Sequence, residues 1–250
     1  MNGRIGRLVV LFVVTFAGLE SPAVHAEKTS HSAIEPKPLG SVSWHTAHHQ
    51  SKLRLAETGA ADLLLIGDGK LIRIGKRELV ESVWGESLAR RGVLSLCNGV
   101  ERTQSLLWRL GDLDFRDLDP KLVVLHVGGS NLYDNTAVQI VEGILLNVAE
   151  LRHKLPNSTI LVLGIIPEGR TADVPPRIRG SQTNRILGEA IRELDDAKVE
   201  FLDVNQEFLD EDGTIRDGLF KSPDYRLPTV QGYEIWAKAM ESTVKRILGD

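Results

Sequence analysis

The sequence predicts an α/β protein, a three-layer α/β/α domain built around a central, mainly five-stranded parallel sheet. Short runs rich in Val, Ile and Leu alternate along the chain with longer segments in which apolar residues recur every three or four positions. Each run is followed by such a segment, which is the order that right-handed strand–helix–strand crossovers require. No internal repeat or second linker divides residues 43–250, so one domain is expected there.

The apolar runs and the helical patterns define the expected elements. The strands are expected at 62–66, 93–96, 122–127, 159–165 and 199–204, and the helices at 136–155, 177–196 and 228–248. The first of these helices has the strongest signal, because Thr136 and Gln139 have the spacing of a capping box and Pro156 follows its last turn. Ligands of parallel sheets bind beyond the carboxyl ends of the strands, so the loops there are the expected site.

The first 26 residues have the order of a secretory leader. Arg4 and Arg7 precede an apolar run at 8–19, and small residues end the segment at Ala26. The run is too short to cross a bilayer as a helix. We therefore expect cleavage after Ala26, an exported protein in the periplasm or outside the cell, and no stable membrane insertion once the leader is removed.

The composition and short motifs of the chain exclude several classes of binding site. Residues 27–42 are polar and contain two prolines, which is typical of a linker. The chain has 30 Lys and Arg against 34 Asp and Glu, so no basic surface for nucleic acid is expected. The single cysteine, Cys97, excludes an intrachain disulfide and a thiolate zinc cluster. The Gly67-Asp68-Gly69 turn lacks the third glycine of a dinucleotide fingerprint, and we expect neither a cofactor nor a metal.

Seven short blocks occur in a characteristic order. They are Trp44–His45, Leu63–Asp68, Thr103–Leu110, Val123–Asn131, Leu163–Pro167, Phe201–Asp203 and Gly232–Ala237. Together they resemble the SGNH or GDSL hydrolases, closest to the branch that contains platelet-activating-factor acetylhydrolase subunits. The resemblance implies the flavodoxin-like SGNH-hydrolase fold, hydrolysis of acyl or acetyl esters of lipids or carbohydrates, and subunits that associate.

The resemblance also implies a serine nucleophile and a C-terminal Asp-x-x-His pair that activates it. Such a serine must lose its proton to a nearby base as it attacks. In this chain the serine position is Gly69, which has no side chain, and the histidine position is Leu227, which cannot accept a proton. The aspartate is kept as Asp224.

The family's oxyanion hole uses a glycine amide and an asparagine side chain, which stabilise negative charge as it develops. The glycine position is Val100, with Gly99 one residue earlier, and the asparagine position is Ser130, with Asn131 one residue later. The chain therefore resembles a family member whose catalytic residues have been replaced.

The remaining polar residues near these positions are candidate binding residues: Asp68, Lys70, Gly99, Asn131 and Arg226. Asp68 either binds a ligand or, as we favour, accepts hydrogen bonds from loop amides. Asp224 is free to pair with Arg226 or with Lys70. His126 lies within an apolar run and is most simply a buried, hydrogen-bonded histidine.

Three hypotheses follow. In the first, the protein is an inactive, exported SGNH-fold esterase relative that acts as a binding or interaction module, with a small ester or carbohydrate as ligand. In the second, it is a weak or unorthodox esterase that uses Ser130, with Lys70 as base, or a water held by Asp68 and Asp224. In the third, it forms a homo-oligomer or associates with an active paralogue.

Overall fold

A computed structural model describes residues 30–57, 61–84 and 92–249. Its five parallel strands are β1 (Leu63–Gly67), β2 (Val93–Ser95), β3 (Leu122–His126), β4 (Thr159–Leu163) and β5 (Val199–Leu202). They form one sheet in the order β2-β1-β3-β4-β5, which confirms the predicted fold class. The predicted leader, residues 1–26, lies outside the described residues.

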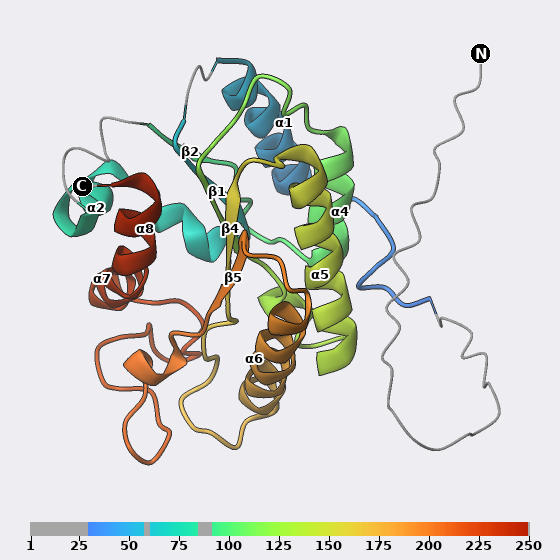
Figure 1. The fold of residues 1–250 in the computed structure, drawn as a ribbon. Coiled ribbons are helices and arrows are strands. Elements are labelled where there is room, and N and C mark those ends of the chain that lie inside the picture. Colours follow the sequence, from blue (N-terminus) through green and yellow to red (C-terminus); the bar gives the residue numbers. More distant parts are fainter. Residues whose placement is uncertain (1–29, 58–60, 85–91, 250) are drawn as a thin grey trace, which may run out of the picture.

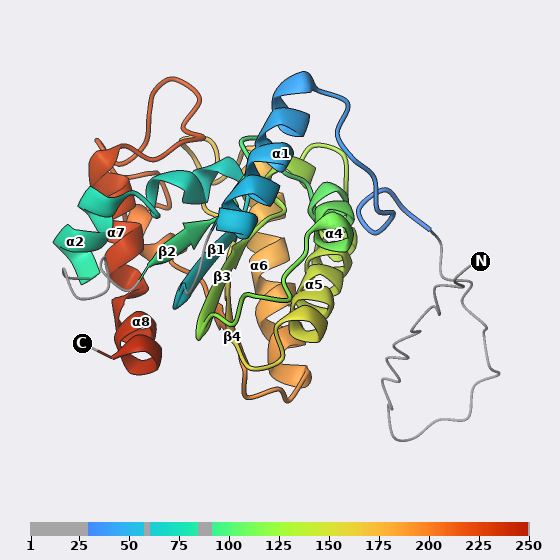
Figure 2. The same cartoon turned by 90° about the horizontal axis from the view of Figure 1, so that it is seen from above.

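Helices cover both faces of the sheet (Figures 1 and 2). On one face lie α4 (Thr103–Asp112), α5 (Ala137–Lys154) and α6 (Pro175–Glu193), and on the other lie α2 (Arg77–Trp84), α7 (Val230–Ala239) and α8 (Glu241–Leu248). The helix α1 (Val42–Glu57) lies beside α4, and three short 3-10 turns, η1 (Gly69–Arg73), η2 (Gly129–Asn131) and η3 (Asn205–Phe208), follow strands. None of the described helices is long and apolar enough to span a membrane.

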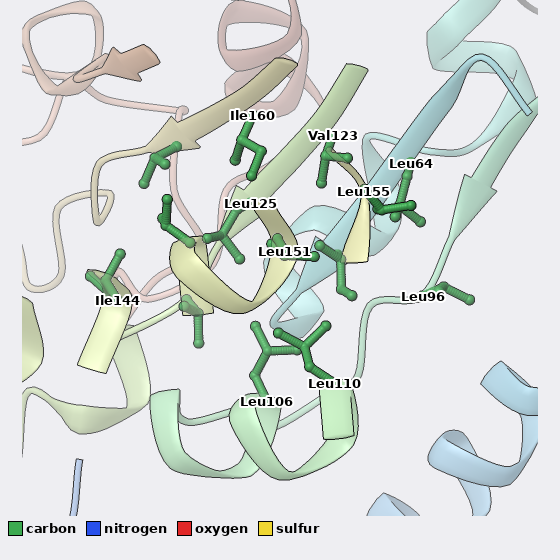
Figure 3. Packing of buried hydrophobic residues seen from close by; sticks show 14 of the residues in the cluster. Leu64, Leu96, Leu106, Leu110, Val123, Leu125, Ile144, Leu151, Leu155 and Ile160 are labelled. Atoms are coloured by element: carbon green, nitrogen blue, oxygen red, sulfur yellow. The ribbon is translucent and has the colours of Figure 1, made fainter. Parts of the chain in front are cut away.

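The strand residues alternate between two apolar clusters. Val123 and Leu125 of β3 point toward α4 and α5, as Figure 3 shows, whereas Leu122 and Val124 pack on the face covered by α7 and α8. Burying each such side chain stabilises the fold by about 1.5–3 kcal/mol. Because both faces are covered, the strand sequences are apolar throughout, and this is why they could be predicted.

The helices of the predicted pattern are present, with one main difference. The Thr136 and Gln139 side chains form the predicted capping box of α5. The predicted helix at 228–248 is instead two helices, α7 and α8, with the fully buried Met240 at their junction. The change of direction lets Trp236 and Val244 both pack into the same apolar cluster, a tertiary requirement that the periodicity of the sequence does not reveal.

Part of the predicted linker is packed against the domain. Thr103 donates a hydrogen bond from Oγ1 to the carbonyl of Ala33 at 2.8 Å, and Lys37 N donates to Gln104 O at 3.2 Å. A Cβ atom on Gly143 of α5 would lie 2.6 Å from the Ala33 carbonyl oxygen. Side chains contribute as well, since Asn135 Nδ2 donates to Ser32 Oγ at 2.9 Å, His31 pairs with Glu142, and Ala33 is fully buried. The polar composition of the segment did not indicate this packing.

Candidate functional site

The carboxyl ends of β1, β2 and β3 are joined by backbone hydrogen bonds. Asp68 N donates to His126 O at 2.9 Å, and Asn98 N donates to Gly67 O at 2.9 Å. Gly67 has a φ of 135°, and a Cβ atom there would lie 1.9 Å from His126 O. Only glycine permits this approach. The loops that follow these strands therefore begin side by side.

Asp68 lies in this edge and is 3% exposed. Its Oδ1 accepts from Lys70 N and lies 3.0 Å from His126 Nδ1. Burial raises the pKa of Asp68, but the charge and hydrogen bond of His126, together with Lys70, outweigh it and hold that pKa below its ordinary value. Hydrogen bonding of Asp68 to a loop amide, the interpretation favoured from the sequence, is confirmed.

His126 is fully buried and hydrogen-bonded, as predicted. Its ring meets the indole of Trp236 edge to face, with centroids 5.0 Å apart. Among the residues that the structure describes, the His126 Nε2 atom has no hydrogen-bond partner. The imidazole thus resembles the oriented histidine of a catalytic triad in its carboxylate contact, but it faces an indole in place of a hydroxyl.

A second carboxylate, Glu168, lies at the same edge, in the loop after β4. Its Oε1 is 2.6 Å from Lys70 Nζ, and its Oε2 accepts a hydrogen bond of 2.8 Å from Tyr133 OH. Arg226 Nε lies 3.5 Å from Oε2, with the guanidinium 5.1 Å from the centre of the Tyr133 ring. The Glu168 side chain is 2% exposed. Its burial is therefore balanced by two hydrogen bonds, from Lys70 and Tyr133, and by the charges of Lys70 and Arg226.

Sequence reasoning identified Lys70 and Arg226 but missed Glu168 and Tyr133. The available signal was position: Glu168 directly follows the Leu163–Pro167 block, at the carboxyl end of a predicted strand. The burial of Tyr133 OH beside Glu168 raises the pKa of this phenol, so the hydroxyl is held as a donor.

The position of the family's nucleophile has no room for a side chain. A Cβ atom on Gly69 would lie 2.6 Å from Gly99 O and 2.8 Å from Gly99 Cα. These are backbone atoms, which do not move aside as the end of a flexible side chain does. A Cβ on Gly99, by contrast, would meet nothing within 4 Å. Gly99 is thus in contact with Gly69, and its role in the structure is to close that position.

A buried ion pair fixes the loop that contains Gly99. Arg109 of α4 donates to Glu101 and, at 2.6 Å, to the carbonyl of Leu96, while Trp44 Nε1 donates to Glu101 at 3.1 Å. Glu101 and Arg109 are both fully buried. Removing one partner of such a pair leaves an uncompensated buried charge, so the loop is held firmly against Gly69.

Asn131 is not available to a ligand. Its Oδ1 accepts from Thr103 N, and its Nδ2 donates to Gln104 and Asn135, each at 3.0 Å. It joins α4 to the loop after β3, and its side chain is fully engaged there. In this structure the Asn131 side chain thus serves to connect α4 with the loop after β3.

The remaining predicted positions lie nearer to solvent. Val100 is 61% exposed and Leu227 is 45% exposed. Asp224 is exposed, and its Oδ1 is 3.4 Å from Arg226 N, whereas the Arg226 side chain turns to Glu168. Ser130 is half-buried, and its hydroxyl makes no hydrogen bond within the described part of the chain.

One cavity of the structure lies elsewhere. It has a volume of about 890 Å³ and lies between α6 and β5, where Arg177, Asn184 and Phe201 line it. None of the residues that the sequence assigns to the site lines this cavity. In residues 30–57, 61–84 and 92–249, no three His, Cys, Asp or Glu side chains are grouped closely enough to hold a metal ion.

Comparison with known proteins decides the family. The model of the GDSL-like Lipase/Acylhydrolase family matches residues 74–235. The chain belongs to this family. The matched region starts after Gly69, so the assignment of Gly69 to the nucleophile position rests on the preceding Leu63–Asp68 block.

The chain is also similar in sequence to two acetylhydrolase subunits and in fold to a solved lipase structure. It is 28% identical over 220 residues to platelet-activating factor acetylhydrolase IB subunit alpha1 of Homo sapiens, covering 86% of this chain and 90% of the relative. It is 28% identical over 176 residues to subunit alpha2 of Rattus norvegicus, covering 70% and 73%. A GDSL-like lipase from Bacteroides thetaiotaomicron has the same fold, with a TM-score of 0.58 and 15% identity over 80% of this chain and 97% of that one.

The close packing at position 69 leads to a first prediction. Gly69→Ser is expected to lower the free energy of unfolding by about 1–3 kcal/mol, because its Cβ overlaps the Gly99 backbone. Urea unfolding measures the change. Gly99→Ala is the matched control and should leave stability within about 0.5 kcal/mol, since its Cβ enters open space. Equal stability of the parent and Gly69→Ser would contradict the closed position.

The environment of Asp68 leads to a second prediction. Because the pKa of folded Asp68 is lowered, its carboxylate stabilises the fold above the unfolded pKa of about 3.9 and loses this contribution as the pH falls below that value. The difference in unfolding free energy between the parent and Asp68→Asn should therefore shrink as the pH falls from about pH 5 to below about pH 4.

Urea unfolding at a series of pH values measures this difference. The control is Asp224→Asn, because Asp224 is exposed and its carboxylate meets only a backbone amide at 3.4 Å. A gap for Asp68→Asn that widens as the pH is lowered would show that the folded carboxyl is protonated more easily than the unfolded one.

Proposed function

We propose that this GDSL-like chain is an exported, non-catalytic member of its family that binds a ligand or partner at the carboxyl edge of the sheet. The observation that carries the proposal is the closed position 69, where Gly99 backbone atoms lie within 3 Å of the site of a Cβ atom. A nucleophile at this position would need both a different residue and a displaced loop.

The base is missing as well as the nucleophile. Leu227 stands at the position that the resemblance assigns to the activating histidine, and it is half exposed to solvent. The imidazole at this edge, His126, is buried against Trp236. Catalytic residues of this kind act as a unit, so their joint loss removes several orders of magnitude in rate. This supports binding in place of hydrolysis.

Residues 1–26 support the exported location, because charged, apolar and small residues follow in the order of a leader. The ligand class is proposed from the family. The similar relatives are named as acetylhydrolase subunits, and a small ester, or a carbohydrate that carries one, is the ligand we propose. Association with a second copy or with an active paralogue is the corresponding proposal for a protein partner.

One observation favours a second candidate function, a weak esterase. The Ser130 hydroxyl is half-buried and makes no hydrogen bond in the described residues. Its neighbour Gly129 lies against Lys70, because a Cβ there would be 3.0 Å from Lys70 Nζ. The residue before Ser130 therefore adjoins an amine, although that amine is paired with Glu168 at 2.6 Å.

Hydrolysis assays separate the two candidates. The purified protein is expected to hydrolyse 4-nitrophenyl acetate and acetylated sugars no faster than Ser130→Ala does, with both at the buffer rate. Absorbance at the nitrophenolate band and acetate release measure the rates. Turnover by the parent that Ser130→Ala abolishes would replace the first candidate by the second.

A further inference from the structure

Two hydrogen-bond donors, Lys70 and Tyr133, and a third group, the Arg226 guanidinium, meet at one carboxylate from three separate loops. Lys70 follows β1, Tyr133 follows β3, and Arg226 precedes α7, yet all three side chains face Glu168. Lys70 contacts one carboxylate oxygen, and Tyr133 and Arg226 face the other. Two cations and a hydroxyl around a carboxylate form the kind of charge-assisted arrangement with which proteins hold anionic ligands.

The Glu168 carboxylate is buried, whereas the Arg226 side chain that pairs with it is exposed to solvent. Glu168 is 2% exposed and Lys70 11%, but the Arg226 side chain is 49% exposed. A buried carboxylate is unfavourable unless its partners balance the loss of hydration. The groups around Glu168 are therefore suited to an anion at this position. Because Arg226 is exposed to solvent, an anion can reach the site from the Arg226 side.

A second carboxylate, Asp68, shares the charge of Lys70 with Glu168, since that charge helps to lower the pKa of Asp68. Asp68 Oδ1 is taken by Lys70 N and His126 Nδ1. Gly129 leaves the space beside Lys70 Nζ free of a side chain, since a Cβ there would lie 3.0 Å from that nitrogen and 3.7 Å from Glu168 Oε1.

We propose that Lys70, Tyr133 and Arg226 form a carboxylate-binding site that the chain fills with its own Glu168, and that an external aliphatic carboxylate binds there by displacing Glu168. This rests on the proposed function, because it assigns a ligand class to the same non-catalytic edge. Tyr133 is 50% exposed and Leu227, next to Arg226, is 45% exposed, so apolar surface adjoins the donors. That surface favours a carboxylate with a short aliphatic chain.

The exchange is neutral in charge, because one carboxylate replaces another. In the parent protein the ligand competes with the Glu168 side chain, which is already in the site. The apparent affinity of the ligand is therefore its intrinsic affinity multiplied by the small fraction of molecules in which Glu168 has left the site. Glu168→Ala removes the competitor and leaves Lys70 and Arg226 without their carboxylate. The variant is therefore expected to be less stable than the parent and to bind free carboxylate more tightly.

The experiment is a thermal unfolding titration of the full-length protein with sodium acetate and sodium hexanoate, with sodium chloride at equal ionic strength as reference. Acetate should raise the unfolding midpoint of Glu168→Ala above the chloride reference, with an apparent affinity about tenfold or more tighter than for the parent. Hexanoate should bind more tightly than acetate. The double variant Lys70→Met/Glu168→Ala should lose the response.

Glu200→Ala is the matched surface control, because Glu200 pairs with Arg246 on the exposed side of β5. It removes a carboxylate from an ion pair outside the site and should show no specific response to acetate. If Glu168→Ala does not fold, Glu168→Gln keeps the shape of the side chain, removes its charge, and should show the same response more weakly.

An absence of acetate-specific stabilisation in both Glu168 variants would overturn the proposal, as would equal acetate binding by the double variant. Equal stabilisation by hexanoate and acetate would remove the aliphatic part of the assignment. Failure of the proposed function would appear separately, as ester turnover by the parent protein, whether or not the Glu168 variants bind acetate.

Discussion

The burial of two carboxylates, Asp68 and Glu168, is the constraint that organises the carboxyl edge of the sheet. A carboxylate removed from water needs donors that replace its hydration, and each has them within about 3 Å. These donors come from the end of β3 and from the loops after β1 and β3, and the fold must bring these segments together. The parallel order of the strands does so, because all carboxyl ends meet at one edge.

Glycine at two positions sets how closely the loops approach. Gly67 brings β1 against His126, and Gly69 lets the Gly99 loop close over the place where the family carries its nucleophile. The buried Glu101–Arg109 pair then holds that loop in position. A serine introduced alone at position 69 would therefore meet a steric obstacle in the Gly99 backbone.

Much of the fold followed from the sequence because strands buried on both faces leave long apolar runs, and β1, β3 and β4 are of this kind. The site was only partly predictable. Gly69 and Lys70 follow the Leu63–Asp68 block, and Glu168 follows the Leu163–Pro167 block in the same way, but only the structure showed that Glu168 faces Lys70. Asn131 proved to be part of the scaffold. The sequence does not show that the Asn131 amide bonds to Thr103 and Gln104 of α4.

By itself the sequence determined the parallel α/β fold, the family, and the absence of a hydroxyl at position 69 and of an imidazole at position 227. These are properties of residue type and order, which a sequence states directly. Only the tertiary structure decided that Lys70 pairs with Glu168, 98 positions away, and that Gly99 covers Gly69. Such contacts depend on how loops leave neighbouring strands, and no local pattern in the chain encodes that geometry.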